Sequence, residues 1–224
     1  MQELLTNFFN WDVYVQTFPF LLKGLWTTLW LSALVIPIGM LAGLLLALWM
    51  TQTRSRIDKL AATVYVDFFR AFPPLVLLIL IYFGIPFTGW EIPKVAAVCV
   101  GFMLNNSSYF CEVFRAGIEA VPRGQTEAAR STGLTQWQAL RHVVIPQATR
   151  KVLPDLLGNC IEVIKLTTIA SVVAMPELLR VARDAQSLVY NPSPIVLAAL
   201  MYLALLWPLV RWISVLQARR HRAA

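Results

Sequence analysis

The stretch that decides the fold is LWTTLWLSALVIPIGMLAGLLLALWM, residues 25–50, which carries no charged side chain. An α-helix needs about 20 predominantly apolar residues to cross the hydrocarbon core of a bilayer. Only helices and closed barrels satisfy all their backbone hydrogen bonds in that environment. This run therefore predicts a membrane-spanning helix.

The rest of the chain repeats this pattern. Of its 224 residues, 58% are hydrophobic and 14% are charged, whereas about a quarter of a soluble domain is charged. We predict an all-α, polytopic membrane helix bundle in a single domain, residues 1–224, with a polar module at about 120–146 between helices three and four. The five predicted transmembrane helices are Leu25–Met50, Ala61–Ile85, Val95–Phe114, Val152–Met175 and Ile195–Ile213.

Lysine and arginine gather on one side of these spans, which predicts the orientation because short cytoplasmic loops are rich in both. Twelve fall in the segments after spans one and three and in the tail: Arg54, Arg56, Lys59, Arg115, Arg123, Arg130, Arg141, Arg150, Lys151, Arg219, Arg220 and Arg222. The other side carries four: Lys23, Lys94, Arg180 and Arg183. We therefore expect the N-terminus outside and the C-terminus in the cytoplasm. No basic n-region or cleavage site precedes the first span, so we expect no removable signal peptide.

Several function classes fit the sequence poorly. The net charge is +7, but basic and aromatic residues do not interleave as in a nucleic-acid site, so we expect no nucleic-acid binding. Cys99, Cys111 and Cys160 lie in or near apolar segments without metal-ligand spacing. We predict no metal site and no catalytic residues.

The polar module has local signals for two short helices. Pro122 can begin the first helix, and Gly133 is placed to end it in a left-handed conformation. Thr135 with Gln138 forms a capping-box pattern that begins the second. We expect that second helix to carry an apolar stripe of Trp137, Leu140 and Val144 and to end near Ile145, before Pro146. The module is either a docking element for a soluble partner or an amphipathic loop on the lipid surface.

The module resembles the coupling motif of ABC importer permeases. The residues that carry the resemblance are Glu127, Ala128, Ala129, Gly133, Val143, Ile145 and Pro146. The flanking segments FRAFPPL, residues 69–75, and EVFRAGI, residues 112–118, resemble the polar amino acid (histidine/glutamine/arginine-like) permeases. The resemblance favours docking to an ATPase, with Trp137 added to the contact surface.

The resemblance implies a type I importer permease in the bacterial cytoplasmic (inner) membrane, moving a polar amino acid or related small solute by alternating access. The implied partners are two ABC ATPase subunits, a second permease subunit, identical or similar, and an extracytoplasmic solute-binding protein. The chain has no phosphate-binding loop. We therefore expect no cofactor on this chain, with ATP and Mg on the partner ATPase.

Polar side chains within the spans are candidates for the substrate pathway, because such residues are costly in a membrane and usually face the bundle interior. The candidates are Asn105, Asn106, Asn159, Glu162 and Thr167. Polar residues also join helices by hydrogen bonds, and Lys165 is placed to neutralise Glu162. In similar permeases an acid often stands where this chain has Leu166, so the resemblance does not imply a basic substrate.

Two alternatives remain open, a membrane-embedded transferase-type enzyme and a channel. The first needs a cluster of nucleophile and base, and the second needs a pore-lining repeat or filter motif. Neither pattern is visible. The longest outer segment, Pro176–Pro194, predicts a short amphipathic helix in which Glu177 and Asp184 offset Arg180 and Arg183.

Overall fold

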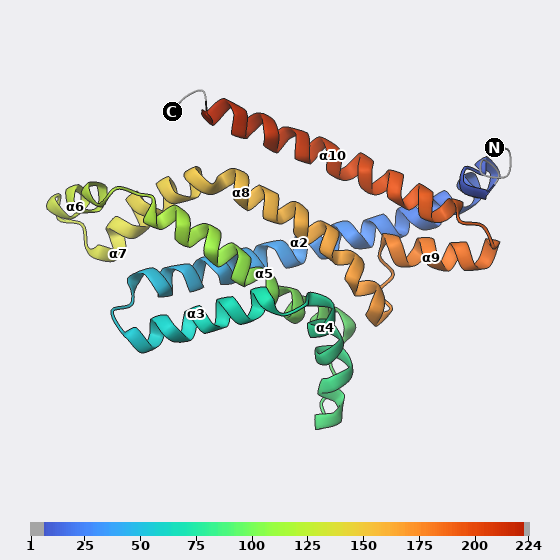
Figure 1. The fold of residues 1–224 in the computed structure, drawn as a ribbon, viewed down its shortest axis with the longest axis horizontal. Helices are drawn as coiled ribbons and strands as arrows, with labels where there is room; N and C mark the ends of the chain where they lie inside the picture. Colours follow the sequence, from blue (N-terminus) through green and yellow to red (C-terminus); the bar gives the residue numbers. More distant parts are fainter. Residues whose placement is uncertain (1–6, 222–224) are drawn as a thin grey trace. The chain divides into compact units, whose positions relative to one another are not determined.

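The computed structural model describes residues 7–221, and all of its secondary structure is helical (Figure 1). This confirms the predicted all-α class. The elements are α2 (Trp11–Gln52), α3 (Arg56–Ala71), α4 (Pro74–Ile79), η1 (Leu80–Gly84), η2 (Ile85–Thr88), α5 (Lys94–Glu119), α6 (Arg123–Ser131), α7 (Gln136–Ala139), η3 (Leu140–Val144), α8 (Ile145–Leu166), η4 (Thr167–Val173), α9 (Leu178–Val189) and α10 (Ser193–His221).

Three helical stretches in the described part of the chain are long and apolar enough to cross a membrane: Trp11–Gln52, Gln136–Val173 and Ser193–Ala218. A fourth is possible if the broken pair Arg56–Ala71 and Pro74–Thr88 counts as one span. The predicted third span lies in α5, which carries Glu112, Arg115 and other polar residues and does not meet the same test. The number five therefore stays a prediction.

The second predicted span is broken at Pro73 and Pro74. Ser55 caps the N-terminus of α3 by accepting a hydrogen bond from the backbone N–H of Asp58 at 3.2 Å. The helix ends before Phe72, whose ψ of 127° is extended, the conformation that a residue before proline prefers. Pro74 then begins α4, a position where its missing N–H costs nothing.

The chain divides into two compact units. The first contains the described parts of Met1–Val35, Pro74–Gly101 and Ile161–Ala224, and the second contains Ile36–Pro73 and Phe102–Cys160. The prediction of one permease domain over residues 1–224 stays a prediction. Of the tail arginines used for the orientation, Arg222 and the side chains of Arg219 and Arg220 lie outside what the structure describes.

Glycines set the packing of the second unit. A Cβ added to Gly43 on α2 would lie 2.5 Å from the Cβ of Phe110 and 2.8 Å from the carbonyl oxygen of Ser107, both on α5. A Cβ on Gly117 of α5 would lie 3.0 Å from Val152 of α8. Small residues allow such close helix contacts where lipid offers no hydrophobic driving force.

The first unit has its own buried cluster, in which α9 packs against the N-terminal part of α2 and the start of α10. The cluster consists of Leu21, Leu178, Ala182, Ala185 and Ala198. A Cβ on Gly24 would lie 2.9 Å from the Cα of Leu178. The amphipathic helix predicted for the outer segment is thus confirmed, and it is packed rather than free in solvent.

Candidate functional site

The polar module forms the predicted corner between two short helices at one end of the second unit (Figure 1). Pro122 is the N-cap residue of α6, which runs from Arg123 to Ser131. Gly133 follows with a φ of +91°, a left-handed conformation that disfavours any residue with a Cβ. Its N–H donates to the carbonyl oxygen of Arg130 at 3.1 Å. The glycine therefore fixes the direction in which the chain leaves α6.

The second helix of the module begins with the predicted capping box. The Thr135 hydroxyl accepts from the backbone N–H of Gln138 at 3.3 Å, and the Gln138 side chain accepts from the backbone N–H of Thr135 at 2.8 Å. Two backbone donors at the start of α7 are thereby satisfied. The corner is held by local hydrogen bonds on both sides of Gly133.

The prediction that this helix ends near Ile145 is wrong. The chain stays helical from α7 through η3 into α8. In η3 the backbone N–H of Ile145 donates to the carbonyl oxygen of Leu140, five residues back, so this turn is a π-turn. The wider turn tolerates Pro146, which lacks an N–H for a regular helical bond. A continuous helical segment therefore joins α7 to the predicted fourth span.

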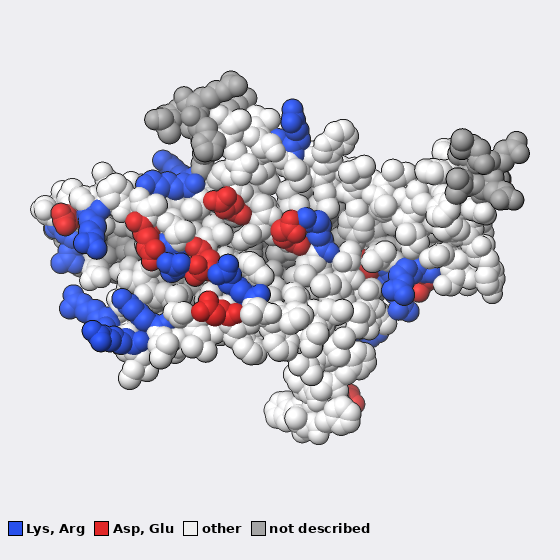
Figure 2. Space-filling view, viewed as in Figure 1, with Lys and Arg blue, Asp and Glu red and all other residues white. Residues whose placement is uncertain are grey.

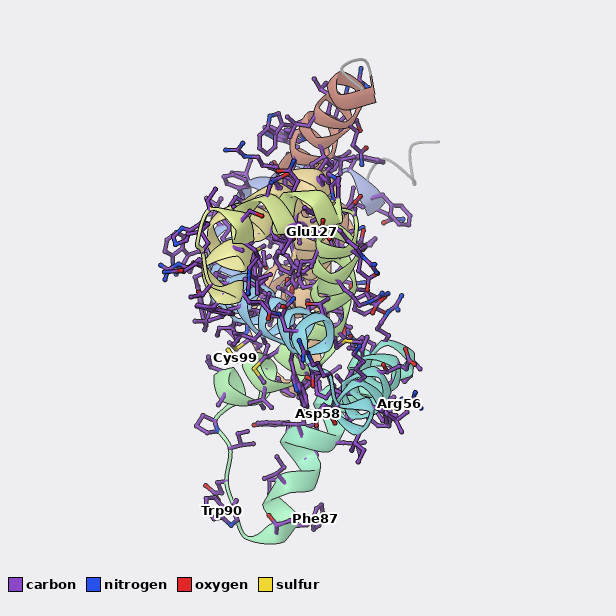
Figure 3. All side chains as sticks on the ribbon, turned by 90° about the vertical axis from the view of Figure 1, so that its left-hand side faces the viewer. Arg56, Asp58, Phe87, Trp90, Cys99 and Glu127 are labelled. Carbon is purple, nitrogen blue, oxygen red and sulfur yellow. The ribbon has the colours of Figure 1, made fainter. Side chains whose placement is uncertain are left out.

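The predicted docking residues differ in exposure. Glu127, Ala128, Gly133, Trp137 and Pro146 are exposed, and the side chain of Glu127 is labelled on α6 in Figure 3. Ile145 is half-buried, while Ala129 is buried within the second unit. Trp137, expected in an apolar stripe, remains 58% exposed, whereas the stripe residues Leu140 and Val144 are buried.

Two neighbouring polar residues of α5 have different surroundings. Asn105 is buried and its side-chain Nδ2 donates to the carbonyl oxygen of Phe69 at 2.8 Å. Asn106 is also buried, yet its Nδ2 has no hydrogen-bond partner among the described residues. An unpaired buried donor costs about 1–3 kcal/mol. Asn105 therefore has a structural role here, and Asn106 retains a free donor.

The remaining pathway candidates lie along α8 and η4. Asn159 is half-buried. Glu162 is exposed and forms an ion pair with Lys165, one of the two alternatives that the sequence left open. The Thr167 hydroxyl is buried and donates to the carbonyl oxygen of Ile164 at 2.7 Å, so it is engaged within its own helix.

The carboxyl of Glu177, which we expected to offset Arg180 and Arg183, is buried and caps α9. Glu177 is 0% exposed and accepts hydrogen bonds from the backbone N–H groups of Leu179 at 2.9 Å and Arg180 at 2.7 Å, and from the Tyr202 hydroxyl at 3.1 Å. Burial raises the pKa of the Glu177 carboxyl, and these hydrogen bonds oppose the rise. Arg180 pairs instead with Asp184. The signal available in the sequence was a Glu directly before the helix, an N-cap position.

The sequence matches one protein family and several individual transport proteins. The family described as binding-protein-dependent transport system inner membrane component matches residues 36–222. The probable amino-acid ABC transporter permease protein YckA of Bacillus subtilis (strain 168) is 37% identical over 78% of this chain and 77% of its own length. The arginine transport system permease protein ArtQ of the same organism is 31% identical over 88% of this chain and 90% of its own length.

Solved structures of ABC transporters have a similar fold. The crystal structure of an amino acid ABC transporter with histidines has a TM-score of 0.81 and 37% identity, covering 92% of this chain and 96% of that one. An inward facing conformation of the MetNI methionine ABC transporter has a TM-score of 0.69 at 24% identity, with 91% of this chain and 95% of that one covered. The second likeness concerns the fold alone.

Proposed function

The chain belongs to the family of binding-protein-dependent transport system inner membrane components, and we propose that it moves a polar amino acid or related small solute by alternating access. As a member of this family it is an inner-membrane permease subunit of an ABC transporter and not an enzyme. The transferase and channel alternatives are thereby set aside.

The substrate class rests on the relatives. The names of several specify amino acids, glutamine or arginine. The choice among amino acids is open, because Leu166 stands where similar permeases often carry an acid. Asn106 supports a pathway through the second unit, since its free buried donor could pair with a substrate carboxylate. Asn159 is proposed as a further lining residue of the second unit, and Asn105 as a residue that holds this part of the pathway in shape. Glu162 and Thr167 belong to the first unit and stay predictions from the sequence.

The proposed coupling element is the module of α6 and α7, which binds a groove on an ATPase subunit. The single observation that carries this proposal is the left-handed corner at Gly133, with the exposed residues Glu127 and Ala128 before it and Trp137 after it. A small side chain such as Ala128 allows close approach of a partner. Ile145 and Pro146 transmit the movement, because the helix continues through both into α8.

The proposed assembly has two permease subunits, identical or similar, two ATPase subunits that bind ATP and Mg, and an extracytoplasmic solute-binding protein. The proposed topology places the module in the cytoplasm and the N-terminus outside, in agreement with the distribution of Lys and Arg. ATP binding closes the ATPase pair, and the two modules convert that closure into an outward-facing pathway.

Uptake into proteoliposomes tests the transport proposal. The complete complex is reconstituted with its ATPase, ATP is supplied on the ATPase side, and the binding protein with a labelled amino acid is supplied on the other. We expect ATP-dependent accumulation of at least one polar amino acid from a panel of acidic, neutral and basic members. Uptake that proceeds equally without ATP would contradict the proposal.

A further inference from the structure

A basic cavity of about 780 Å³ opens in the second unit at the point where the apolar run of α2 ends. Its wall includes the end of α2, the following turn, the end of α5, and parts of α6, α7 and η3. Four of the lining residues are cationic: Arg54, Lys59, Arg123 and Arg130. Figure 2 shows Lys and Arg side chains gathered at the end of the unit where α6 and the start of α3 lie.

The charge of this cavity is not balanced within the protein. Glu119 is the one acidic residue of the wall, and it pairs with Arg115, whose Nη1 lies 3.0 Å from its Oε2. None of the four cations forms an ion pair within the part of the chain that the structure describes. The cavity therefore has an excess of positive charge available to a ligand.

An apolar groove of about 450 Å³ adjoins the basic cavity. Leu48, Trp49 and Trp137 line it, and it shares Gln52, Gln136 and Leu140 with the cavity. The Gln136 side chain donates to the Gln52 side chain at 3.1 Å across this shared wall. A charged compartment and an apolar one thus lie next to each other, separated by one hydrogen-bonded pair of side chains.

We propose that the cavity and groove together bind one anionic phospholipid, with its phosphate among the four cations and an acyl chain along Leu48 and Trp49. A soluble phosphate would use only the basic cavity and leave the groove empty. The site lies where a spanning helix leaves the bilayer, the level at which Trp side chains and basic pockets meet lipid headgroups. The inference rests on the proposed membrane topology and not on the coupling role.

The lipid would connect two parts of the chain that are far apart in sequence. Trp49 belongs to α2 and Arg54 to the turn after it, whereas Arg123 and Arg130 belong to α6 of the proposed coupling module. A bound lipid contacts both, so it holds the module against the end of α2. The anionic lipid content of the membrane becomes a determinant of how firmly the module is held.

Native mass spectrometry of the purified complex, with its ATPase subunits, tests this proposal. The probes are dioleoyl phosphatidylglycerol, dioleoyl phosphatidylcholine and inorganic phosphate. Each cation contributes about fivefold to binding of an anionic lipid. We therefore expect the double variant Arg54→Gln and Lys59→Gln to bind phosphatidylglycerol about 25-fold more weakly. The matched control, Arg141→Gln and Arg150→Gln, removes two exposed cations of the same unit outside the cavity and should bind as the parent does.

Further outcomes decide the nature of the ligand. Trp49→Ala should weaken phosphatidylglycerol binding because it shortens the apolar wall. Equal affinity for the two lipids, or equal loss in the control variant, would overturn the proposal. Displacement of the lipid by inorganic phosphate at similar concentration would identify a soluble phosphate site instead. Loss of the ATPase subunit from the Arg54 and Lys59 variant, with lipid affinity unchanged, would identify a protein contact. Uptake activity is measured separately, so a failure of the proposed transport function remains distinguishable.

Discussion

The side-chain Nδ2 of Asn105 donates to the carbonyl oxygen of Phe69 at 2.8 Å. In a regular helix this carbonyl would accept from the N–H four residues on, but that residue is Pro73, which has none. Arg70 has the same problem with Pro74, and its carbonyl oxygen accepts from the Tyr109 hydroxyl at 3.3 Å. Two residues one turn apart on α5 thus satisfy the two carbonyls that the proline pair leaves without a partner.

Substitution of Asn105 should therefore destabilise the fold. Asn105→Leu keeps the size of the side chain but leaves the part-buried Phe69 carbonyl without a donor, at a cost of about 1–3 kcal/mol. The measurement is the thermal unfolding of the purified complex in detergent. Tyr109→Phe is the milder comparison, because its bond is longer and its side chain is 39% exposed. An Asn105→Leu protein as stable as the parent would contradict the structural role.

Substitution of the neighbouring residue, Asn106, should not destabilise the fold. Asn106 has a buried Nδ2 without a partner in the described structure, so Asn106→Leu should leave stability unchanged or raise it by about 1 kcal/mol. If Asn106 lines the pathway, the same variant should reduce substrate-dependent uptake. Unfolding and uptake are measured on the same preparation. Full uptake in the variant would remove Asn106 from the proposed pathway.

Close packing of α2 on α5 predicts a strong effect at Gly43. A Cβ there would meet Phe110 Cβ at 2.5 Å and backbone atoms of α5 below 3.0 Å. Overpacking of this kind costs about 1–3 kcal/mol, so Gly43→Ala should lower the unfolding temperature. Gly158→Ala is the matched control, because nothing lies within 4 Å of its added Cβ. Similar unfolding temperatures for the two variants would contradict the observed helix contact.

The buried carboxyl of Glu177 predicts a dependence of stability on pH. Burial raises its pKa above the ordinary value, so the folded protein holds this proton to a higher pH than the unfolded chain does. Its contribution to stability is complete below the unfolded pKa of about 4.3 and is lost as the pH rises through the folded pKa. Glu177→Gln removes the titration, and its stability should fall less over the same interval.

Unfolding temperatures of the parent and Glu177→Gln, measured from about pH 4 to about pH 8, check this expectation. The advantage of the variant should grow with pH, although Gln accepts the capping hydrogen bonds less strongly than a carboxylate. Glu91→Gln, a change to an exposed carboxyl, serves as control and should follow the parent. Parallel curves for the parent and Glu177→Gln would contradict the raised pKa.

Local signals in the sequence predicted the local structure well. The left-handed Gly133 and the capping box at Thr135 depend on residues within one or two turns, and the structure confirms both. The continuation of the helix through Pro146 was not predicted, because a π-turn carries no clear sequence signal.

Contacts between residues far apart in the sequence could not be predicted, because they leave no local sequence signal. Arg70 lies 3.9 Å from Glu112 on another helix, and Glu177 meets Tyr202 across the fold of the first unit. In the sequence, the basic residues of the cavity indicated only the orientation of the predicted spans. Their assembly around one cavity depends on the meeting of α2, α5 and α6. The exposed aromatic tip with Phe87 and Trp90, labelled in Figure 3, was likewise not anticipated.

The central claim, that the corner at Gly133 transmits ATPase closure, is tested most directly by ATPase activity of the reconstituted complex with its binding protein and substrate. Gly133→Val places a β-branched residue at a φ of +91°, which its side chain disfavours. Gly84→Val is the control, with a φ of −86° and open space around it. We expect Gly133→Val to reduce substrate-stimulated hydrolysis to the basal rate while Gly84→Val retains it. Full stimulation in Gly133→Val would contradict the coupling role of this module.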